Sequence, residues 1–261
     1  MTQTTLPTTT TTQTMESSSS CVLPDDYANL ILLGAGNITG IGNAYDNRII
    51  GNLGQNTLAG GAGNDVIETG GGADQVDGGT GVDTVLLPDL DGGYNLAWIA
   101  GGAALTARAN IHEYVTVKNA EHIQAGRLHV AWANEGHADQ VYGLYQAAFY
   151  RKPDVEGMGF WLNKYNEGTS LTTIAAEFMK SEEFSRRFPG VADDTADLVT
   201  MMYHHVLHRE PDAEGYAYWK GVMDAHLIDS AQLLVYFAGS EENQVNIVGS
   251  MAQGYAYLLP A

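Results

Sequence analysis

The hydrophobic positions between residues 42 and 86 recur once in every nine residues. Laid out from Gly42, each nonamer has one aliphatic residue at its eighth place, behind a stretch rich in glycine and polar residues. These aliphatic residues are Ile49, Leu58, Ile67, Val76 and Val85. A tight glycine turn followed by a short strand with one inward side chain has this pattern. Because one nonamer cannot bury its single aliphatic residue, the pattern predicts stacked nonamers that share a thin core.

The same frame extends toward the N-terminus with one interruption. The segment "PDDYANLIL" (24–32) fits it, with Asn29 at the sixth place and Ile31 at the eighth. The nonamer between this segment and Gly42 breaks the phase at Ile38 and Gly40.

The sixth place of each nonamer has an oxygen-bearing side chain. In chain order these residues are Asn47, Asn56, Asp65, Asp74 and Asp83. Stacking the nonamers lines up carboxylates and carbonyl oxygens along an edge, and such a row repels itself unless a hard cation lies between successive turns. Calcium takes six to eight oxygen ligands in flexible geometry, so the row predicts calcium sites.

These nonamers resemble the RTX, or haemolysin-type, calcium-binding nonapeptide repeat family. "GGAGNDVIE" (60–68) and "GGTGVDTVL" (78–86) match the family pattern at every required place, and "TGGGADQVD" (69–77) departs only at its first. The earlier nonamers have Asn in place of Asp. The resemblance covers about Tyr27 to Leu87 and implies a calcium-binding parallel β-roll over residues 25–87.

The resemblance also implies a set of calcium ligands. If two nonamers form one coil, Asp65 and Asp83 face one another across a calcium ion, with Asn47 one coil earlier, while Asp74 and Asn56 share the opposite edge. We expect the Asp65/Asp83 site to be the tightest, because Asn is neutral, and about one to three ions in total. Backbone carbonyls are expected to complete the coordination shells near Gly61, Gly63, Gly72, Gly79 and Gly81.

Residues 88–134 read as further strands. Period-two alternation in "YVTV" and "LHVAW" supports this assignment. RTX rolls are often followed by a similar non-repeating β-segment that covers the open end of the roll. An exposed edge there could otherwise pair with strands of other chains. We expect a structural capping role for this segment.

The pattern changes to helical periods over residues 137–246. One predicted helix places Val141, Leu144, Tyr145, Ala148 and Phe149 on a single face. The segment 144–161 then recurs as 202–219, an offset of 58 residues (144 to 202). The region is therefore predicted to be a duplicated helical unit, with repeats at about 137–190 and 194–246.

Both helical repeats contain the signature Arg-x-Pro-Asp-x-x-Gly-x-x-x-Trp. The unit resembles the helical domain of unknown function that accompanies RTX repeats in secreted and surface-layer-associated bacterial proteins, a family with no established activity. We expect Asp154 and Asp212 to be helix N-caps and Trp161 and Trp219 to anchor the packing. The signature arginine is expected to pair with a carboxylate across the turn.

The two ends of the chain differ from the repeats in composition. Residues 1–24 form a Thr/Ser-rich segment that is too polar to bury a core, and we expect a disordered tail without a cleaved leader. From Asn243 the chain has no charged side chain to its end. Residues 247–261 are thus either a candidate secretion signal or a last helix or strand packed on its domain.

Overall charge limits the partners. With 12 basic and 31 acidic side chains the formal charge is -19, so nucleic acid and anionic membranes are expected to repel the chain. Cys21 is the only cysteine, which excludes an internal disulfide and a two-cysteine metal site. No apolar run approaches the roughly 20 residues of a transmembrane helix.

The sequence does not predict catalytic residues. His204 and His208 have the spacing of a zinc pair, but the glutamate of the metalloprotease motif is missing and the first repeat has Gln146 and Tyr150 at these places. We favour solvent-facing or capping histidines. No Gly-x-Ser-x-Gly elbow occurs either.

The chain is therefore expected to be a multidomain β + α protein: a short parallel β-roll with a β capping segment, then an all-α duplicated helical domain. Its expected function is that of a secreted, non-enzymatic protein at the cell surface or outside the cell, which folds on binding calcium. The resemblance implies export by the type I secretion apparatus and a protein, glycan or surface-layer partner for the helical module. A secreted hydrolase with its activity in the helical domain and a purely structural assembly subunit are the alternatives.

Overall fold

A computed structural model describes residues 13–132, 138–251 and 253–259. The chain divides into two compact units, Met1–Ala131 and Trp132–Ala261. We call the first the roll unit and the second the helical unit.

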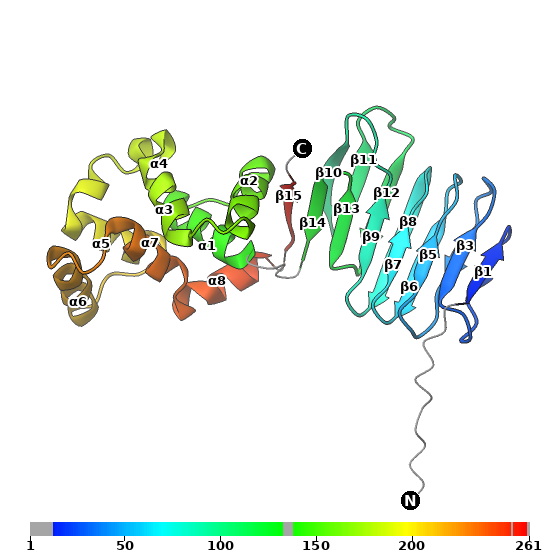
Figure 1. Ribbon diagram of the computed structural model, residues 1–261, viewed down its shortest axis with the longest axis horizontal. Helices are drawn as coiled ribbons and strands as arrows, with labels where there is room; N and C mark the ends of the chain where they lie inside the picture. The colour runs from blue at the N-terminus through cyan, green and yellow to red at the C-terminus, as the bar shows by residue number, and fades with distance from the viewer. Residues whose placement is uncertain (1–12, 133–137, 252, 260–261) are drawn as a thin grey trace, which may run out of the picture. The chain divides into compact units, whose positions relative to one another are not determined.

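The roll unit is a parallel β-solenoid with strands on two opposite faces (Figure 1). From Gly40 to Val85, a residue on each face pairs with the residue 18 positions later, as Ile49 does with Ile67 and Leu58 with Val76. The first strands pair at spacings of 15 and 19 residues. One ladder consists of β1 (Thr14–Ser17), β3 (Asn29–Leu32), β5 (Arg48–Ile50), β7 (Val66–Glu68) and β9 (Thr84–Leu87). The other consists of β2 (Cys21–Val22), β4 (Thr39–Ile41), β6 (Thr57–Ala62) and β8 (Ala73–Thr80).

The predicted thin core is confirmed. The eighth-place residues are buried: Ile49, Leu58, Ile67 and Val85 are 0 % exposed, and Val76 is 4 % exposed. Because equivalent places stack at every 18th residue, these aliphatic side chains form one continuous column between the two faces.

The first coil differs from the predicted frame by one residue. Leu30, not Ile31, pairs with Ile49 and is buried. The phase break at Gly40 does not interrupt the ladder, since Gly40 pairs with Leu58. The side chains of Leu30 and Leu32 lie within van der Waals distance of the missing Cβ of Gly40, so they fill the space that its side chain would take.

The expected disorder of residues 1–24 is wrong for the part that the structure describes. Thr14 to Ser17 form β1, which pairs in parallel with β3, and Cys21 and Val22 form β2, which pairs with β4. Threonine and serine are too polar for a core, but their backbone can still complete the ladder at the first edge of a sheet. Residues 1–12 lie outside the described part.

The segment after the repeats adds strands to the last coil, as expected for a cap. β12 pairs in parallel with β8, and β13 pairs in parallel with β9. β10 and β11 extend the sheet that contains β12 and β8, as an antiparallel meander. β14 forms a hairpin with β13. The strands are β10 (Tyr94–Ile99), β11 (Gly102–Ala107), β12 (Tyr114–Lys118), β13 (His122–Ala125) and β14 (Leu128–Ala131).

The helical unit repeats the same four-helix pattern. The first copy consists of α1 (Ala138–Phe149), α2 (Val155–Asn166), α3 (Leu171–Lys180) and α4 (Glu182–Arg187). After the short helix η1 (Val191–Asp193), the second copy consists of α5 (Thr195–His205), α6 (Ala213–Asp224), α7 (Ser230–Ala238) and α8 (Glu241–Met251). Within this unit Figure 1 shows that helices of both copies lie next to one another, as α3 and α7 do.

The signature segment holds two helices together in each copy. Asp154 caps α2 by accepting a hydrogen bond from Gly157 N. Arg151 forms a bidentate ion pair with Glu183 of α4, in which Nε donates to Oε1 at 2.7 Å and Nη2 donates to Oε2 at 2.9 Å. In the second copy Asp212 caps α6 and Arg209 pairs with Glu242 of α8 at 2.8 and 3.1 Å.

The signature tryptophans anchor the packing of each copy, as predicted. Trp161 packs edge-on against Phe178 at a ring-centroid distance of 5.3 Å. The ring of Trp219 packs against that of Phe237 in a tilted arrangement, with a centroid distance of 5.4 Å. Each tryptophan therefore ties the second helix of its copy to the third.

The described part of the uncharged tail has regular secondary structure. It contains the end of α8 and the strand β15 (Tyr255–Leu258), which packs against α2 where Gly159 leaves room for the carbonyl of Leu258. This packing agrees with the alternative of a last element packed on its domain. In the described residues, no helix has the length and apolar character needed to cross a membrane.

We predict that Asp154→Ala lowers the free energy of unfolding of the helical unit by about 1 kcal/mol, because the substitution leaves an N-terminal N–H of α2 without an acceptor. Asp154→Asn keeps a capping oxygen and loses only the exposed pairing with Arg151 at 3.3 Å, so its effect should be a few tenths of a kcal/mol. Chemical denaturation followed at 222 nm measures both. Equal effects of the two substitutions would show that the cap is not the stabilising feature.

Candidate metal centre

Three carboxylates are buried at the turns of the roll. Asp65 and Asp83 immediately precede β7 and β9, and Asp74 lies near the start of β8. Their side chains are at most 1 % exposed. Charged side chains are almost never buried to this degree without a partner.

One oxygen of each carboxylate is held by the preceding turn. Asp65 Oδ1 accepts a hydrogen bond from Asn47 N at 2.7 Å, and Asp83 Oδ1 accepts one from Asp65 N at 2.8 Å. On the other face Asp74 Oδ1 accepts from Asn56 N at 2.8 Å. The fold thus aligns Asn47, Asp65 and Asp83 in one row and Asn56 and Asp74 in another, the arrangement that the resemblance implies.

The second oxygen of each carboxylate has no partner. The atoms Asp65 Oδ2, Asp74 Oδ2 and Asp83 Oδ2 are buried and accept no hydrogen bond from any residue in the part of the chain that the structure describes. A buried carboxylate oxygen without a partner is costly, whereas an oxygen directed into a turn of carbonyl groups is a ligand for a hard cation.

Burial strongly affects the acidity of these groups. Desolvation raises the pKa of Asp65 to about 6, with a further contribution from the negative charge of Asp83. Desolvation raises the pKa of Asp74 to about 7 and also raises the pKa of Asp83, where Glu121 adds its charge. Without a cation these side chains are therefore poorly suited to carry their charge at neutral pH.

The residues fit calcium with many backbone ligands. Among the residues that the structure describes, no group of three or more His, Cys, Asp or Glu side chains is placed to hold a metal ion. A cation beside Asp65, Asp74 or Asp83 would therefore take most of its ligands from carbonyl groups of the stacked turns. Calcium accepts such a ligand set, and bound calcium would keep the carboxylates ionised.

Asn47 and Asn56 differ from the expected calcium ligands. Asn47 Oδ1 accepts a hydrogen bond from Asn43 N, and Asn56 Oδ1 accepts one from Asn52 N, each at 2.8 Å. The side-chain oxygens are thus engaged within the protein. The sequence placed both residues in the expected rows. It did not reveal that each is hydrogen-bonded to the asparagine at the second place of its own nonamer.

The five predicted glycines shape the turns. Their φ angles all lie in the region that favours glycine. A Cβ on Gly79 would overlap the carbonyl of Gly61 in the turn before it, and similar overlaps occur at the others. Direct ligation by their carbonyls stays a prediction. The φ angles are 110° at Gly61, 108° at Gly63, 96° at Gly72, 109° at Gly79 and 138° at Gly81.

Glu121 belongs to the same row but was missed. Its Oε2 accepts a hydrogen bond from Asp83 N at 2.8 Å, as Asp83 itself does for Asp65. Glu121 follows Asp83 by 38 residues and lies outside the nonamer array. The repeat pattern therefore contains no signal for it.

Among the described histidines of the helical unit, His204 and His208 have different contact partners. His204 Nε2 lies 2.8 Å from Glu210 Oε2. The ring of His208 packs edge-on against Tyr150, with a centroid distance of 5.6 Å. The pair at helical spacing thus makes separate surface contacts, in agreement with the interpretation as solvent-facing histidines.

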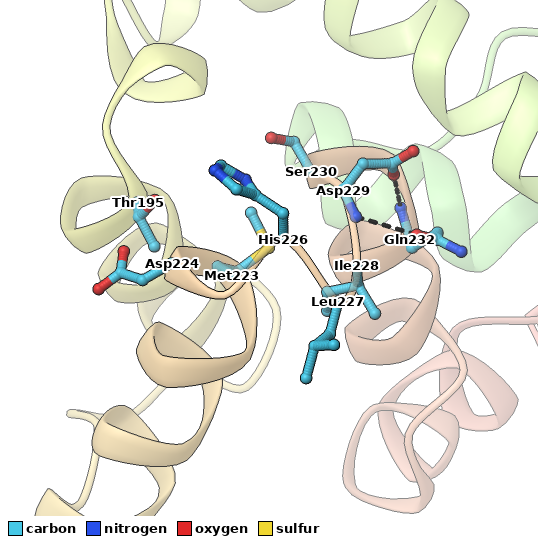
Figure 2. A pocket seen from close by; sticks show the side chains of 9 residues that line it. All are labelled: Thr195, Met223, Asp224, His226, Leu227, Ile228, Asp229, Ser230 and Gln232. Atoms are coloured by element: carbon cyan, nitrogen blue, oxygen red, sulfur yellow. Dashed lines mark hydrogen bonds between the residues drawn. The ribbon is translucent and has the colours of Figure 1, made fainter.

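The helical unit also has an open pocket of about 750 Å³ (Figure 2). The imidazole of His226 lies between Thr195 and Ser230 in this view. Two acidic side chains line the pocket. Asp229 caps α7 in a capping box with Gln232, and Asp224 pairs with Lys220 one turn earlier in α6.

Comparisons with known proteins agree with this geometry. Residues 39–63 and 50–85 match the RTX calcium-binding nonapeptide repeat (4 copies), and residues 131–188 and 175–247 match the Domain of unknown function (DUF4214). No curated protein matches the chain. Among solved structures, the chain is similar to the extracellular lipase LipA from Serratia marcescens, with 15 % identity and a TM-score of 0.32.

The similarity to the lipase covers 38 % of this chain and 19 % of the lipase. The family matches are more informative, because they fall on the roll and on the two helical copies separately. The chain therefore contains RTX calcium-binding nonapeptide repeats, and these are followed by a helical region that matches the DUF4214 model.

Proposed function

We propose that the chain is a secreted, non-enzymatic protein in which calcium bound beside Asp65, Asp74 and Asp83 completes the folding of the roll. The observation that carries this proposal is the set of three buried Oδ2 atoms without a partner. Each is fixed through its Oδ1 atom by the neighbouring turn. The positions of the ligands are therefore set by the fold, and only the counter-charge is left to the solution.

Calcium would act as a folding switch. At low calcium the stacked carboxylates destabilise the last coils, which favours an incompletely folded, exportable chain. Outside the cell, binding to the folded form stabilises it by mass action. Extracellular calcium modules often bind at about 0.1–1 mM, which suits such a switch.

The helical unit is proposed to bind a protein, a glycan or the surface layer outside the cell. Phe160 and Tyr218 occupy equivalent places in the two copies, directly before the signature tryptophans, and they are 52 % and 61 % exposed. Exposed aromatic side chains at matching places are suited to recognition of a partner. RTX repeats are typical of secreted proteins. We therefore include export by type I secretion in the proposed function.

Two other functions are less well supported. A hydrolase would need a nucleophile and a base in contact, and the pocket of Figure 2 uses Asp229 and Gln232 to hold a helix end instead. A structural assembly subunit would show concentration-dependent association. Sedimentation at several protein concentrations distinguishes this last function from the proposed one.

We predict that Asp65→Asn/Asp83→Asn weakens calcium-driven folding at least about tenfold in calcium concentration, a loss of about 1.4 kcal/mol. The substitutions keep the side-chain shape and the hydrogen-bonding Oδ1 atom but remove the charge. Far-UV circular dichroism during a calcium titration measures the midpoint. Asp25→Asn/Asp91→Asn, at two exposed positions, is the charge-matched control and should leave the midpoint unchanged. An unchanged midpoint in the double variant would contradict the assignment.

We also predict that the metal-free and calcium-bound roll respond to pH in opposite ways. The folded pKa values are about 6 for Asp65 and about 7 for Asp74, above the unfolded value near 3.9. The folded metal-free state then binds more protons, so its stability falls as pH rises from about 4 to about 7. Calcium binds the ionised form, so its stabilising effect grows over the same range.

Thermal unfolding of metal-free protein at pH 5 and pH 7.5 tests this pH dependence. The melting temperature of the roll should be lower at pH 7.5, and saturating calcium should remove or invert the difference. Asp74→Asn has no titrating group at this place and should reduce the pH dependence of the metal-free form. A metal-free roll that becomes more stable toward pH 7.5 would show that the buried carboxylates do not titrate as described.

A further inference from the structure

The second and sixth places of the nonamers vary together. In the five nonamers from Gly42 to Leu86, asparagine at the second place is accompanied by asparagine at the sixth, and glycine at the second place is accompanied by aspartate at the sixth. The asparagine pairs are Asn43/Asn47 and Asn52/Asn56, and the glycine–aspartate pairs are Gly61/Asp65, Gly70/Asp74 and Gly79/Asp83. The two kinds of nonamer are segregated, with the asparagine pairs toward the N-terminus.

The second-place asparagine bridges two carbonyl groups of the coil before it. Asn43 Nδ2 donates to Pro24 O at 3.0 Å and to Tyr27 O at 2.9 Å. Asn52 Nδ2 donates to Leu33 O and to Gly36 O, both at 3.1 Å. The acceptors lie 19 and 16 residues before the donor in both cases. The same bridge is therefore built twice, once on each face of the roll.

The sixth-place asparagine completes each bridge. Asn47 Nδ2 donates to Asn43 Oδ1 at 2.9 Å, while Asn43 N donates to Asn47 Oδ1 at 2.8 Å. Asn56 and Asn52 make the same two contacts at the same distances. Asn47 and Asn56 are 3 % and 2 % exposed, and these buried amides are neutral and hydrogen-bonded, so they need no counter-ion.

The aspartate nonamers lack this bridge. Glycine at their second place has no side chain to reach the neighbouring coil, and the sixth-place carboxylate has an Oδ2 atom without a partner. The carbonyl groups 19 and 16 residues before these glycines belong to Gly42 and Tyr45, Gly51 and Gly54, and Gly60 and Gly63.

We infer that the paired asparagines of the first turns take the place of bound calcium, so that these turns fold without metal and calcium binding is confined to the Asp65, Asp74 and Asp83 turns. This inference rests on the proposed function. A side-chain amide with two N–H groups links two carbonyl oxygens across the coils, as a cation would, but it is covalently part of the chain and always present.

The inference gives the roll a direction of folding. In stacked repeats each coil is stabilised mainly by its neighbours, so an ordered coil lowers the barrier for the next one. The metal-independent turns around Asn43 and Asn52 would then form a folded template at low calcium. The aspartate turns would add to this template when calcium becomes available.

Converting one asparagine pair into a glycine–aspartate pair tests the inference. In Asn52→Gly/Asn56→Asp, the nonamer 51–59 gains the residues of the aspartate type at both places, and Gly54 already has the fourth place. Native mass spectrometry of the full chain in calcium should show one more bound ion than the wild type. Asn52→Ala, which removes the amide without adding a carboxylate, should bind the same number of ions as the wild type.

Hydrogen exchange of calcium-free protein gives the second measurement. In the wild type, residues 39–59 should exchange at least about tenfold more slowly than residues 78–87. Both Asn52 variants should lose this protection, and calcium should restore it only in Asn52→Gly/Asn56→Asp. Loss of protection in Asn52→Ala that calcium does restore would overturn the inference.

Failure of the inference and failure of the proposed function have different signatures. Calcium binding by the wild type with equal exchange of residues 39–59 and 78–87 in the metal-free state would overturn the inference alone. An unchanged ion count in Asn52→Gly/Asn56→Asp would do the same. A wild type that binds no calcium at all would overturn the proposed function and, with it, the inference.

Discussion

The stacking of each coil on the coil 18 residues earlier is the constraint on which the roll depends. This register places one aliphatic residue of every nonamer in the core and one oxygen-bearing side chain at every turn. The core needs this repetition, because no nonamer could bury its aliphatic residue alone. The same repetition unavoidably stacks polar oxygen atoms in rows, where they need positive partners.

The chain meets this need in two ways. In the first turns the partners are amide N–H groups, as in the hydrogen bonds from Asn43 to Pro24 and Tyr27. In the later turns we propose that the partner is a cation from solution, because within the described residues Asp65, Asp74 and Asp83 each keep a buried oxygen without a donor. An amide bridge is permanent, whereas a cation bridge depends on the medium, so the stability of the later coils becomes a function of calcium concentration.

The repeat frame was predictable because the register is periodic. The same periodicity predicted the burial of Ile49, Leu58 and Ile67 and the two rows of sixth-place side chains. Features outside the period were not predictable. Glu121 extends a row from 38 residues away, and β1 pairs through its backbone, where composition gives no signal. The role of Asn47 depended on a hydrogen bond to Asn43 that spacing alone does not reveal.

The helical unit follows a different rule, in which a charged signature segment fixes the helices of each copy.

An anomalous difference map from crystals grown in calcium tests most directly whether calcium binds in the roll. The account predicts peaks beside the Oδ2 atoms of Asp65, Asp74 and Asp83 and none beside Asn47 or Asn56. A map without peaks at the three carboxylates, or with peaks at the asparagine pairs, would contradict it.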